Sequence, residues 1–193
     1  MTKFHNIILI LLFLSTSIKP EILYSNKYLV LLAPPLLFLY ILFIFKEEWL
    51  QYNLNYLRES SFYFWTFKAF QFSIFTQAIG TVLLGKATSF TENSIHTYSI
   101  LPIYTVTIGP IMEEVIFRKI IFKRLHNIFN FGVAAFASST IFAWVHYNPT
   151  RFPIYLVIGV IMCWVYNKSG NITTIIAAHI IINFTAILVS DLI

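Results

Sequence analysis

The sequence predicts an all-α fold, a polytopic integral membrane bundle of about seven transmembrane helices that forms a single domain over residues 1–193. Three observations support this fold class. Hydrophobic residues make up 58% of the chain and charged residues only 11%, whereas a soluble domain has roughly 25% charged residues. The mean hydropathy is +0.76. Apolar runs of membrane-spanning length also recur from one end of the chain to the other.

Seven segments have the composition of membrane spans. They are Phe4–Ile18, Tyr28–Phe45, Phe62–Leu84, Ser99–His126, Phe131–His146, Phe152–Tyr166 and Ile172–Ile193. The first resembles a signal peptide, but no small-residue cleavage site follows it, so we expect an uncleaved span. Pro34 and Pro35 should kink the second span, which neighbouring helices in a bundle can tolerate. We expect the fourth to be either one long helix or a helix broken at Gly109-Pro110.

The segments between the spans suggest how the chain is oriented. Lys46–Ser61 mixes charged and apolar residues, so it is either an amphipathic helix at the interface or a charged loop, and Lys86–Tyr98 is a polar loop. The densest basic cluster lies within 118–126, which places the C-terminal end of the fourth span in the cytoplasm. With seven spans, the N-terminus is then inside the cell and the C-terminus outside. The net charge of +5 therefore reports loop composition rather than nucleic-acid binding. A single cysteine, Cys163, excludes an internal disulfide and a thiolate metal cluster.

Two adjacent carboxylates and an arginine lie inside the fourth apolar segment, in Pro-Ile-Met-Glu-Glu-Val-Ile-Phe-Arg. Ionisable groups at such depth are costly, so they face the bundle interior or a wet cavity. Glu114 and Arg118 are four residues apart and can pair on one helix face. Glu113 points about 100° away from Glu114, so one carboxylate can be held by the arginine while the other faces a cavity. A structural ion pair with one further helix-end carboxylate is an equally good interpretation of this motif alone.

Later spans carry His146, and His179 with Asn183. A single histidine in an apolar span is more often a hydrogen-bonded core group than a ligand, and a buried amide can cross-link membrane helices. The combination favours chemistry, because three spans each carry a costly polar group of a type that hydrolysis needs. A shielded carboxylate can act as a general base, a neutral histidine can position water or bind a metal, and histidine or asparagine can donate to an oxyanion.

These motifs together resemble a known family. Glu-Glu-x-x-x-Arg at 113–118, Phe-x-x-x-His at 142–146 and His-x-x-x-Asn at 179–183 occur in the order and spacing of the CPBP family of intramembrane proteases (CAAX protease and bacteriocin-processing, also called Abi). The resemblance covers residues 98–190, which would carry the catalytic core. Many family members have glycine directly after the arginine, where this chain has Lys119.

The resemblance implies a role for each motif residue. Glu113 would be the general base that activates water, with Glu114 as the less favoured alternative, and His146 would help to hold that water. His179 and Asn183 would stabilise the oxyanion. Arg118 would be structural, or would bind a substrate carboxylate.

The cofactor is left open between zinc and no metal. The zinc-protease pattern His-Glu-x-x-His is absent, and Glu113, His146 and His179 would be the only obvious ligand set. A metal-independent glutamate mechanism is favoured over a metalloprotease.

We therefore expect an intramembrane endopeptidase in a bacterial plasma membrane. Its partners would be membrane lipids and a membrane-adjacent peptide or protein substrate, with no nucleic acid. Maturation of a secreted peptide, or immunity to a bacteriocin, fits the resemblance better than a prenylated substrate. The rival hypotheses are a non-catalytic scaffold or immunity protein of the same fold and, less favoured, a transporter or proton relay.

One geometric difficulty accompanies these expectations. Counted from the predicted helix ends at Lys123 and Phe131, Glu113 and His146 lie roughly 15 Å and 22 Å deep. The two groups can meet only if the fifth helix tilts or begins below the membrane surface.

Overall fold

The computed structural model describes residues 2–17, 25–85 and 98–190, and within these ranges it is helical, with no strand. All seven predicted spans form helices where they are described, apart from turns at span ends, such as Ser99-Ile100 in the fourth span and Val145-His146 in the fifth. The long helices are α1 (Thr2–Ser17), α3 (Lys27–Ile44), α5 (Ser60–Leu84), α10 (Phe131–Trp144), α11 (Phe152–Ser169) and α12 (Ile172–Ser190). Most of the predicted polar loop at 86–98, including His96, lies outside the described residues.

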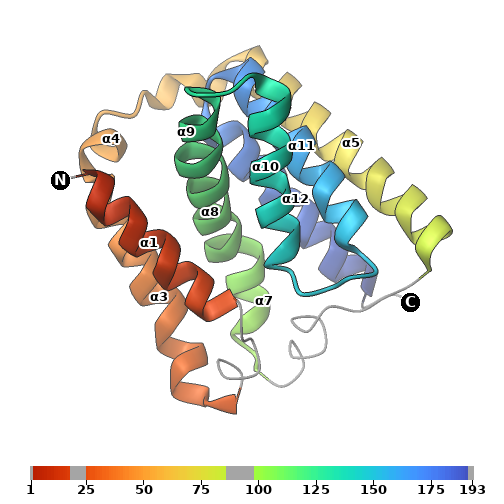
Figure 1. Cartoon of the computed structure of the whole chain (residues 1–193), viewed down its shortest axis with the longest axis horizontal. Coiled ribbons are helices and arrows are strands. Elements are labelled where there is room, and N and C mark those ends of the chain that lie inside the picture. The colour runs from red at the N-terminus through yellow and green to blue at the C-terminus, as the bar shows by residue number, and fades with distance from the viewer. Residues whose placement is uncertain (1, 18–24, 86–97, 191–193) are drawn as a thin grey trace.

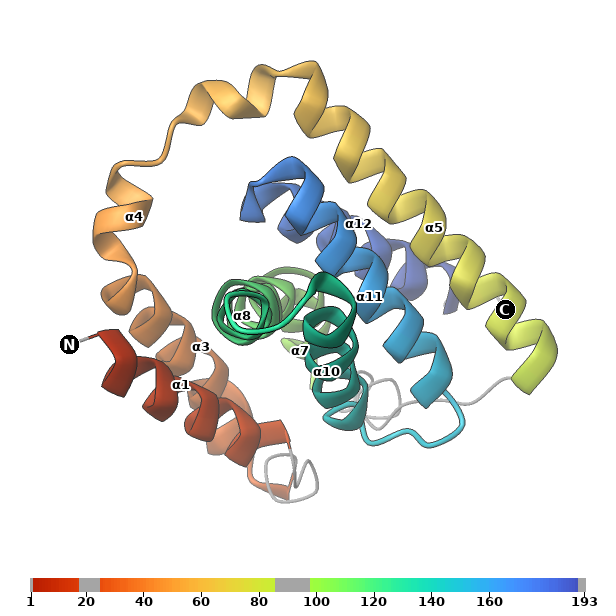
Figure 2. The ribbon, with the colours of Figure 1, turned by 45° about the horizontal axis from the view of Figure 1, so that its top comes forward.

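The segment 101–126 lies at the centre of the bundle. Figure 2 looks nearly along its axis, with α1 and α3 on one side and α10, α11 and α12 on the other. The helix α5 lies farther out, against α11 and α12. This arrangement surrounds the acidic motif with helices from both halves of the chain.

The central segment winds without interruption, so of the two predicted alternatives the single long helix is observed, with no break at Gly109-Pro110. Its consecutive parts are α7 (Leu101–Ile103), η2 (Tyr104–Ile108), α8 (Gly109–Glu114), η3 (Val115–Phe122) and α9 (Lys123–His126). The parts η2 and η3 are π-helical. The Gly109 N–H donates to the Tyr104 carbonyl, five residues earlier. A wider turn before Pro110 thus accommodates the proline without ending the helix.

The N-terminal hairpin of α1 and α3 packs beside the central segment (Figure 1). The α3 helix continues through Pro34 and Pro35. Its Leu31 carbonyl accepts a hydrogen bond of 3.0 Å from the Tyr104 hydroxyl. Pro35 cannot donate to that carbonyl in the ordinary four-residue pattern, so a side chain from the central segment satisfies it instead.

The connection from α3 to α5 is neither the continuous amphipathic helix nor the plain loop that the sequence predicts. It consists of α4 (Lys46–Leu50) and the 3₁₀ helix η1 (Leu54–Arg58). Side chains hold it to the bundle. Tyr52 and Tyr56 hydroxyls lie 2.7 Å and 2.8 Å from the hydroxyls of Thr173 and Thr174 at the start of α12.

Lys119 fixes the other end of this connection. Its ammonium pairs with Glu48 and lies 4.4 Å and 5.3 Å from the ring centroids of Phe45 and Trp49. A lysine at this position therefore binds the connection through charge and cation–π contacts. Close packing against a small residue is not needed here.

Close helix approach occurs instead between α10 and α11. Small residues of α10 are buried at this contact, namely Ala134, Ala135, Ser138 and Ser139. A Cβ atom added at Gly159 of α11 would lie 2.7 Å from the Ser139 Cβ. The small-residue stretch lets two backbones come close together in the membrane.

Four described helices are long and apolar enough to cross a membrane by length and composition, namely α3, α5, α11 and residues Ile172–Val189 of α12. Residues Phe4–Thr16 of α1 and the α10 helix are apolar but shorter. Large apolar side chains point outward on these helices, such as Phe64 and Phe75 on α5, which are 53% and 58% exposed. An outward apolar surface is what a lipid solvent requires, so the fold is a polytopic helical membrane bundle.

Candidate active site

The two adjacent carboxylates end α8 and point in different directions. Glu114 is fully buried, whereas the Glu113 side chain is 22% exposed. Consecutive residues on a helix differ by about 100° in direction, so one carboxylate enters the core and its neighbour does not.

Glu114 is held by two positively polarised partners. Arg118 Nη1 lies 3.1 Å from Glu114 Oε1, as the four-residue spacing predicts, and the His179 Nδ1–H of α12 donates to the same oxygen at 2.7 Å. The Arg118 guanidinium also lies over the Phe142 ring, 4.3 Å from its centroid. Arg118 is only 1% exposed. This buried cluster joins the central segment to α10 and α12.

Glu113 makes a single, longer contact within the cluster. Its Oε2 lies 3.8 Å from His179 Nε2, which is beyond direct hydrogen-bond distance. The His179 imidazole therefore lies between the two carboxylates, with its Nδ1 on Glu114 and its Nε2 toward Glu113. Of the two carboxylates, Glu113 has more free capacity to bind water or substrate.

His146 follows the end of α10 in a tight turn. Its ring lies between Phe142 and Tyr155, with centroid distances of 4.6 Å and 4.1 Å, and its Nδ1 lies 2.7 Å from the Phe142 carbonyl. Tyr147, the next residue, has a φ of 52°, a left-handed conformation that is uncommon outside glycine. The turn and the two rings thus fix both the position and the orientation of the imidazole.

His146 and Glu113 lie at the same level of the bundle, which resolves the difference in depth counted from the predicted helix ends. The rings of Phe117 and Phe142 are in contact, with centroids 5.3 Å apart. The two segments run antiparallel, so the residue four positions after Phe142 is level with the residue four positions before Phe117. His146 and His179 both lie against the Phe142 ring, with centroid distances of 4.6 Å and 6.4 Å. The difference came from counting depth from Lys123 instead of from the turn at 127–130.

Asn183 lies one turn beyond His179 on α12. Its Nδ2 donates to the Thr105 carbonyl of η2 at 2.9 Å. An amide nitrogen carries two hydrogens, so one N–H of Asn183 is engaged and the second can serve another acceptor. Thr105 is a site residue that the sequence analysis did not identify, although its position five residues before Pro110 could have indicated it.

The structure therefore brings Glu113, Glu114, Arg118 and His179 into direct contact, sets His146 beside them, and places Asn183 on the adjoining turn. The described residues contain no group of three or more His, Cys, Asp or Glu side chains arranged to hold a metal ion. Glu113, His146 and His179 are therefore not arranged as a metal site in the described structure, and the choice between zinc and no metal stays a prediction.

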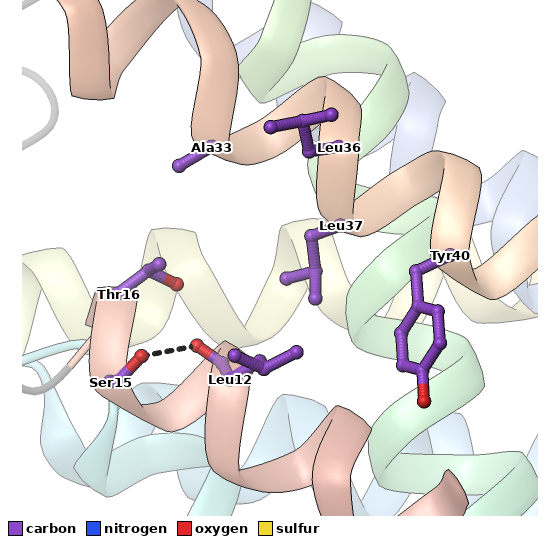
Figure 3. Close-up of a pocket in the computed structure, with 7 residues that line it drawn as sticks. All are labelled: Leu12, Ser15, Thr16, Ala33, Leu36, Leu37 and Tyr40. Atoms are coloured by element: carbon purple, nitrogen blue, oxygen red, sulfur yellow. Dashed lines mark hydrogen bonds between the residues drawn. The ribbon is translucent and has the colours of Figure 1, made fainter.

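Two apolar hollows of the described surface lie elsewhere. One, of about 240 Å³, lies between α1 and α3 and is lined by Leu12, Ser15, Thr16, Ala33, Leu36, Leu37 and Tyr40 (Figure 3). The Ser15 hydroxyl donates to the Leu12 carbonyl of its own helix. Another hollow, of about 250 Å³, is lined by Ala78, Ile79, Val82 and Leu83 of α5. Neither hollow includes a residue of the buried cluster.

The fold and the site define a class of protein, a polytopic helical membrane protein with a buried carboxylate, arginine and histidine cluster at its centre. Residues 94–185 match the family described as type II CAAX prenyl endopeptidase Rce1-like. This part, just under half of the chain, is similar to that family, in agreement with the resemblance to the CPBP proteases.

Three curated bacterial proteins are similar to the chain. "Putative membrane peptidase YdiL" of Bacillus subtilis is 30% identical over 128 residues, which is 62% of this chain and 52% of that protein. "Membrane-embedded CAAX protease MroQ" of Staphylococcus aureus is 37% identical over 82 residues, and "UPF0177 protein YbdJ" of Lactococcus lactis is 38% identical over 77 residues. Each of these two matches covers 39% of this chain and 33% of the relative. The chain thus spans between a third and about half of the length of these relatives.

No solved structure matches the chain significantly. The apolar helices and the bacterial relatives together support a bacterial multi-pass membrane protein.

Proposed function

We propose that this protein is a membrane-embedded endopeptidase in which Glu113 activates a water molecule. The observation that carries the proposal is the meeting of Glu113, Glu114 and His179, from two helices. His146 lies against the same Phe142 ring as His179. Ionisable groups inside a membrane bundle are expensive and are typically functional. The peptidase names of the family and of two relatives support the same reaction class.

The surroundings of the two carboxylates divide their roles. Glu114 is engaged by Arg118 and His179 and is fully buried, so it orients its neighbours. Glu113 has only the longer contact to His179 and is partly exposed. The general base must reach the water whose proton it removes, and this requirement favours Glu113.

Hydrogen bonds at Nδ1 fix what each imidazole can do. A carbonyl and a carboxylate only accept hydrogen bonds. The Nδ1–H of His146 therefore donates to the Phe142 carbonyl, and the Nδ1–H of His179 donates to the Glu114 carboxylate. In the neutral state each Nε2 therefore bears a lone pair. His146 Nε2 can accept a hydrogen bond from the attacking water. His179 Nε2 becomes a donor only when the imidazole is protonated.

These roles give a balanced hydrolysis. Glu113 takes a proton from water while the water oxygen attacks the peptide carbonyl carbon, which forms a tetrahedral oxyanion. The free N–H of Asn183 and a protonated His179 donate to that oxyanion. Glu113 then passes its proton to the leaving nitrogen as the carbon–nitrogen bond breaks, which yields a free amine and a carboxyl group.

The substrate class proposed here is a peptide segment at or within the membrane. The cluster lies inside a bundle whose outer face is apolar, so a substrate reaches it from the membrane or its surface. A bacterial membrane also favours a secreted peptide or an immunity pathway over a prenylated protein. Arg118 is engaged by Glu114 and buried, which argues for positioning rather than for binding a substrate carboxylate.

The test compares membrane peptides from cells that carry the wild type, Glu113→Gln or His146→Ala. A peptide product present with the wild type and absent with both variants supports the proposal and identifies the substrate. Glu47→Gln is the matched control, because Glu47 lies on α4 with its side chain 72% exposed. Identical peptides in all strains, with the variants still complementing a deletion, would refute the enzyme and leave the scaffold or immunity hypothesis. Dependence of the phenotype on an ion gradient, with no product, would point to the transporter.

A further inference from the structure

We infer that Pro110 is a positioning residue for Asn183, and that it acts by leaving the Thr105 carbonyl without a main-chain donor. The inference deepens the proposed function. Its effect on catalysis rests on that function, whereas the hydrogen bond from Asn183 to the Thr105 carbonyl is a property of the fold. Asn183 comes from α12 and Pro110 from α8, so the sequence does not connect them.

The hydrogen-bond register of η2 creates the free carbonyl. The Gly109 N–H donates to the Tyr104 carbonyl, five residues earlier. In this register the next carbonyl, Thr105, would accept from residue 110. That residue is proline and has no N–H. Asn183 Nδ2 supplies the missing donor at 2.9 Å.

The bond sets the direction of the Asn183 amide. A main-chain carbonyl only accepts, so the nitrogen and not the oxygen of the amide faces Thr105. One N–H is thereby fixed, and the planar amide fixes the direction of the second. That second N–H is the one assigned above to the oxyanion. Asn183 lies one helical turn from His179, whose ring contacts both Glu113 and Glu114.

The same arrangement occurs elsewhere in the bundle. Pro35 leaves the Leu31 carbonyl of α3 without its four-residue partner, and the Tyr104 hydroxyl donates to it at 3.0 Å. In both cases a polar side chain of another segment bonds a carbonyl that a proline has freed, as membrane helices require. Tyr104 and Thr105 are neighbours, so the two bonds join α3, η2 and α12 at one level.

Pro110→Ala tests the inference. The new N–H would serve Thr105 directly in the five-residue register. If the turn tightens to the four-residue register, the Gly109 N–H serves Thr105 instead. In either register a main-chain N–H then competes with Asn183 for the Thr105 carbonyl. Pro153→Ala is the matched control, because Pro153 lies in the first turn of α11, where a proline removes no intrahelical bond.

The first measurement is independent of activity. The full-length protein in lipid nanodiscs is labelled with ¹⁵N-asparagine, and the Asn183 side-chain resonances are assigned through Asn183→Asp. We expect Pro110→Ala to move these resonances and Pro153→Ala to leave them in place. Unmoved Asn183 resonances in a folded Pro110→Ala protein would overturn the inference, whether or not the chain hydrolyses peptides.

A second measurement addresses catalysis. We expect Pro110→Ala to lower kcat by about 10- to 100-fold with little change in KM, because an oxyanion donor acts in the transition state. The same substitution in an Asn183→Ala background should then change kcat less than about twofold. An equal loss in both backgrounds would show that Pro110 acts without Asn183.

A third measurement covers the case in which Pro110→Ala does not fold. With ¹³C-carbonyl threonine in the otherwise unchanged chain, Asn183→Leu should shift the Thr105 carbonyl resonance. An unshifted resonance would overturn the bond on which the inference is built.

Discussion

Replacing Arg118 with methionine should strongly destabilise the bundle. Arg118 and Glu114 are 1% and 0% exposed, with 3.1 Å between Nη1 and Oε1. Removing one partner of a buried pair leaves an uncompensated charge, which costs about 3–5 kcal/mol. The His179 Nδ1 bond to Glu114 remains, which favours the lower part of that range. The contact of the guanidinium with Phe142 is also lost, and a desolvated cation–π contact contributes about 2 kcal/mol.

The assay is equilibrium unfolding in detergent micelles titrated with SDS and followed by tryptophan fluorescence. Arg118→Met should lower the free energy of unfolding by about 3–5 kcal/mol, whereas the double variant Glu114→Gln/Arg118→Met should lose less than the sum of the single variants. Arg118→Lys, which keeps a positive charge, provides a milder variant if the methionine protein does not accumulate.

Two results would refute this reasoning. One is a loss below about 1 kcal/mol for Arg118→Met, which is the size expected of an exposed pair. The other is strict additivity of the single variants, which would mean that the two side chains are energetically independent.

Three further predictions concern packing and attachment, each checked by the same unfolding assay. Gly159→Ala should cost about 1–3 kcal/mol, because its Cβ would lie 2.7 Å from the Ser139 Cβ. Gly132→Ala is its control and should be neutral or stabilising, because the added Cβ would lie 3.5 Å from the side-chain oxygen of Asn130. Lys119→Met should lower the free energy of unfolding by about 1–2 kcal/mol, because the Glu48 pair and the cation–π contacts are lost. It should also change the fluorescence emission of Trp49, and unchanged emission would contradict this attachment. Tyr104→Phe should cost about 1 kcal/mol by leaving the Leu31 carbonyl without its donor, and an unaltered free energy of unfolding would argue against that bond.

Local sequence patterns were sufficient for the fold class and for one contact of the site. Long apolar runs give helices in lipid because backbone groups have no other partners there, and all seven predicted spans form helices where described, apart from turns at span ends. The four-residue spacing of Glu114 and Arg118 places them on one face, and they meet at 3.1 Å. Small residues allow close helix approach in a membrane, and the stretch from Ala134 to Ser139 makes such a contact at Gly159.

Sequence patterns failed where the hydrogen-bond register or a distant contact decides the outcome. A break of the central helix at Gly109-Pro110 was one of two alternatives, but a wider turn accommodates the proline. Helix periodicity in the sequence does not reveal such a turn. The segment 46–61 has an amphipathic composition, yet contacts with Lys119, Thr173 and Thr174 hold it as two short pieces. The level of His146 depends on where the turn at 127–130 lies, which composition does not specify.

The sequence by itself determined that this chain is a helical membrane protein and which polar residues its spans contain, because burial in lipid and helix periodicity are local constraints. Only the tertiary structure decided that His179 lies between the two carboxylates, that Glu113 is the less engaged of them, and that Asn183 bonds to Thr105. These contacts join residues that are 65 to 78 positions apart. Their geometry follows from helix packing and from the carbonyl that Pro110 leaves free, which no single segment encodes.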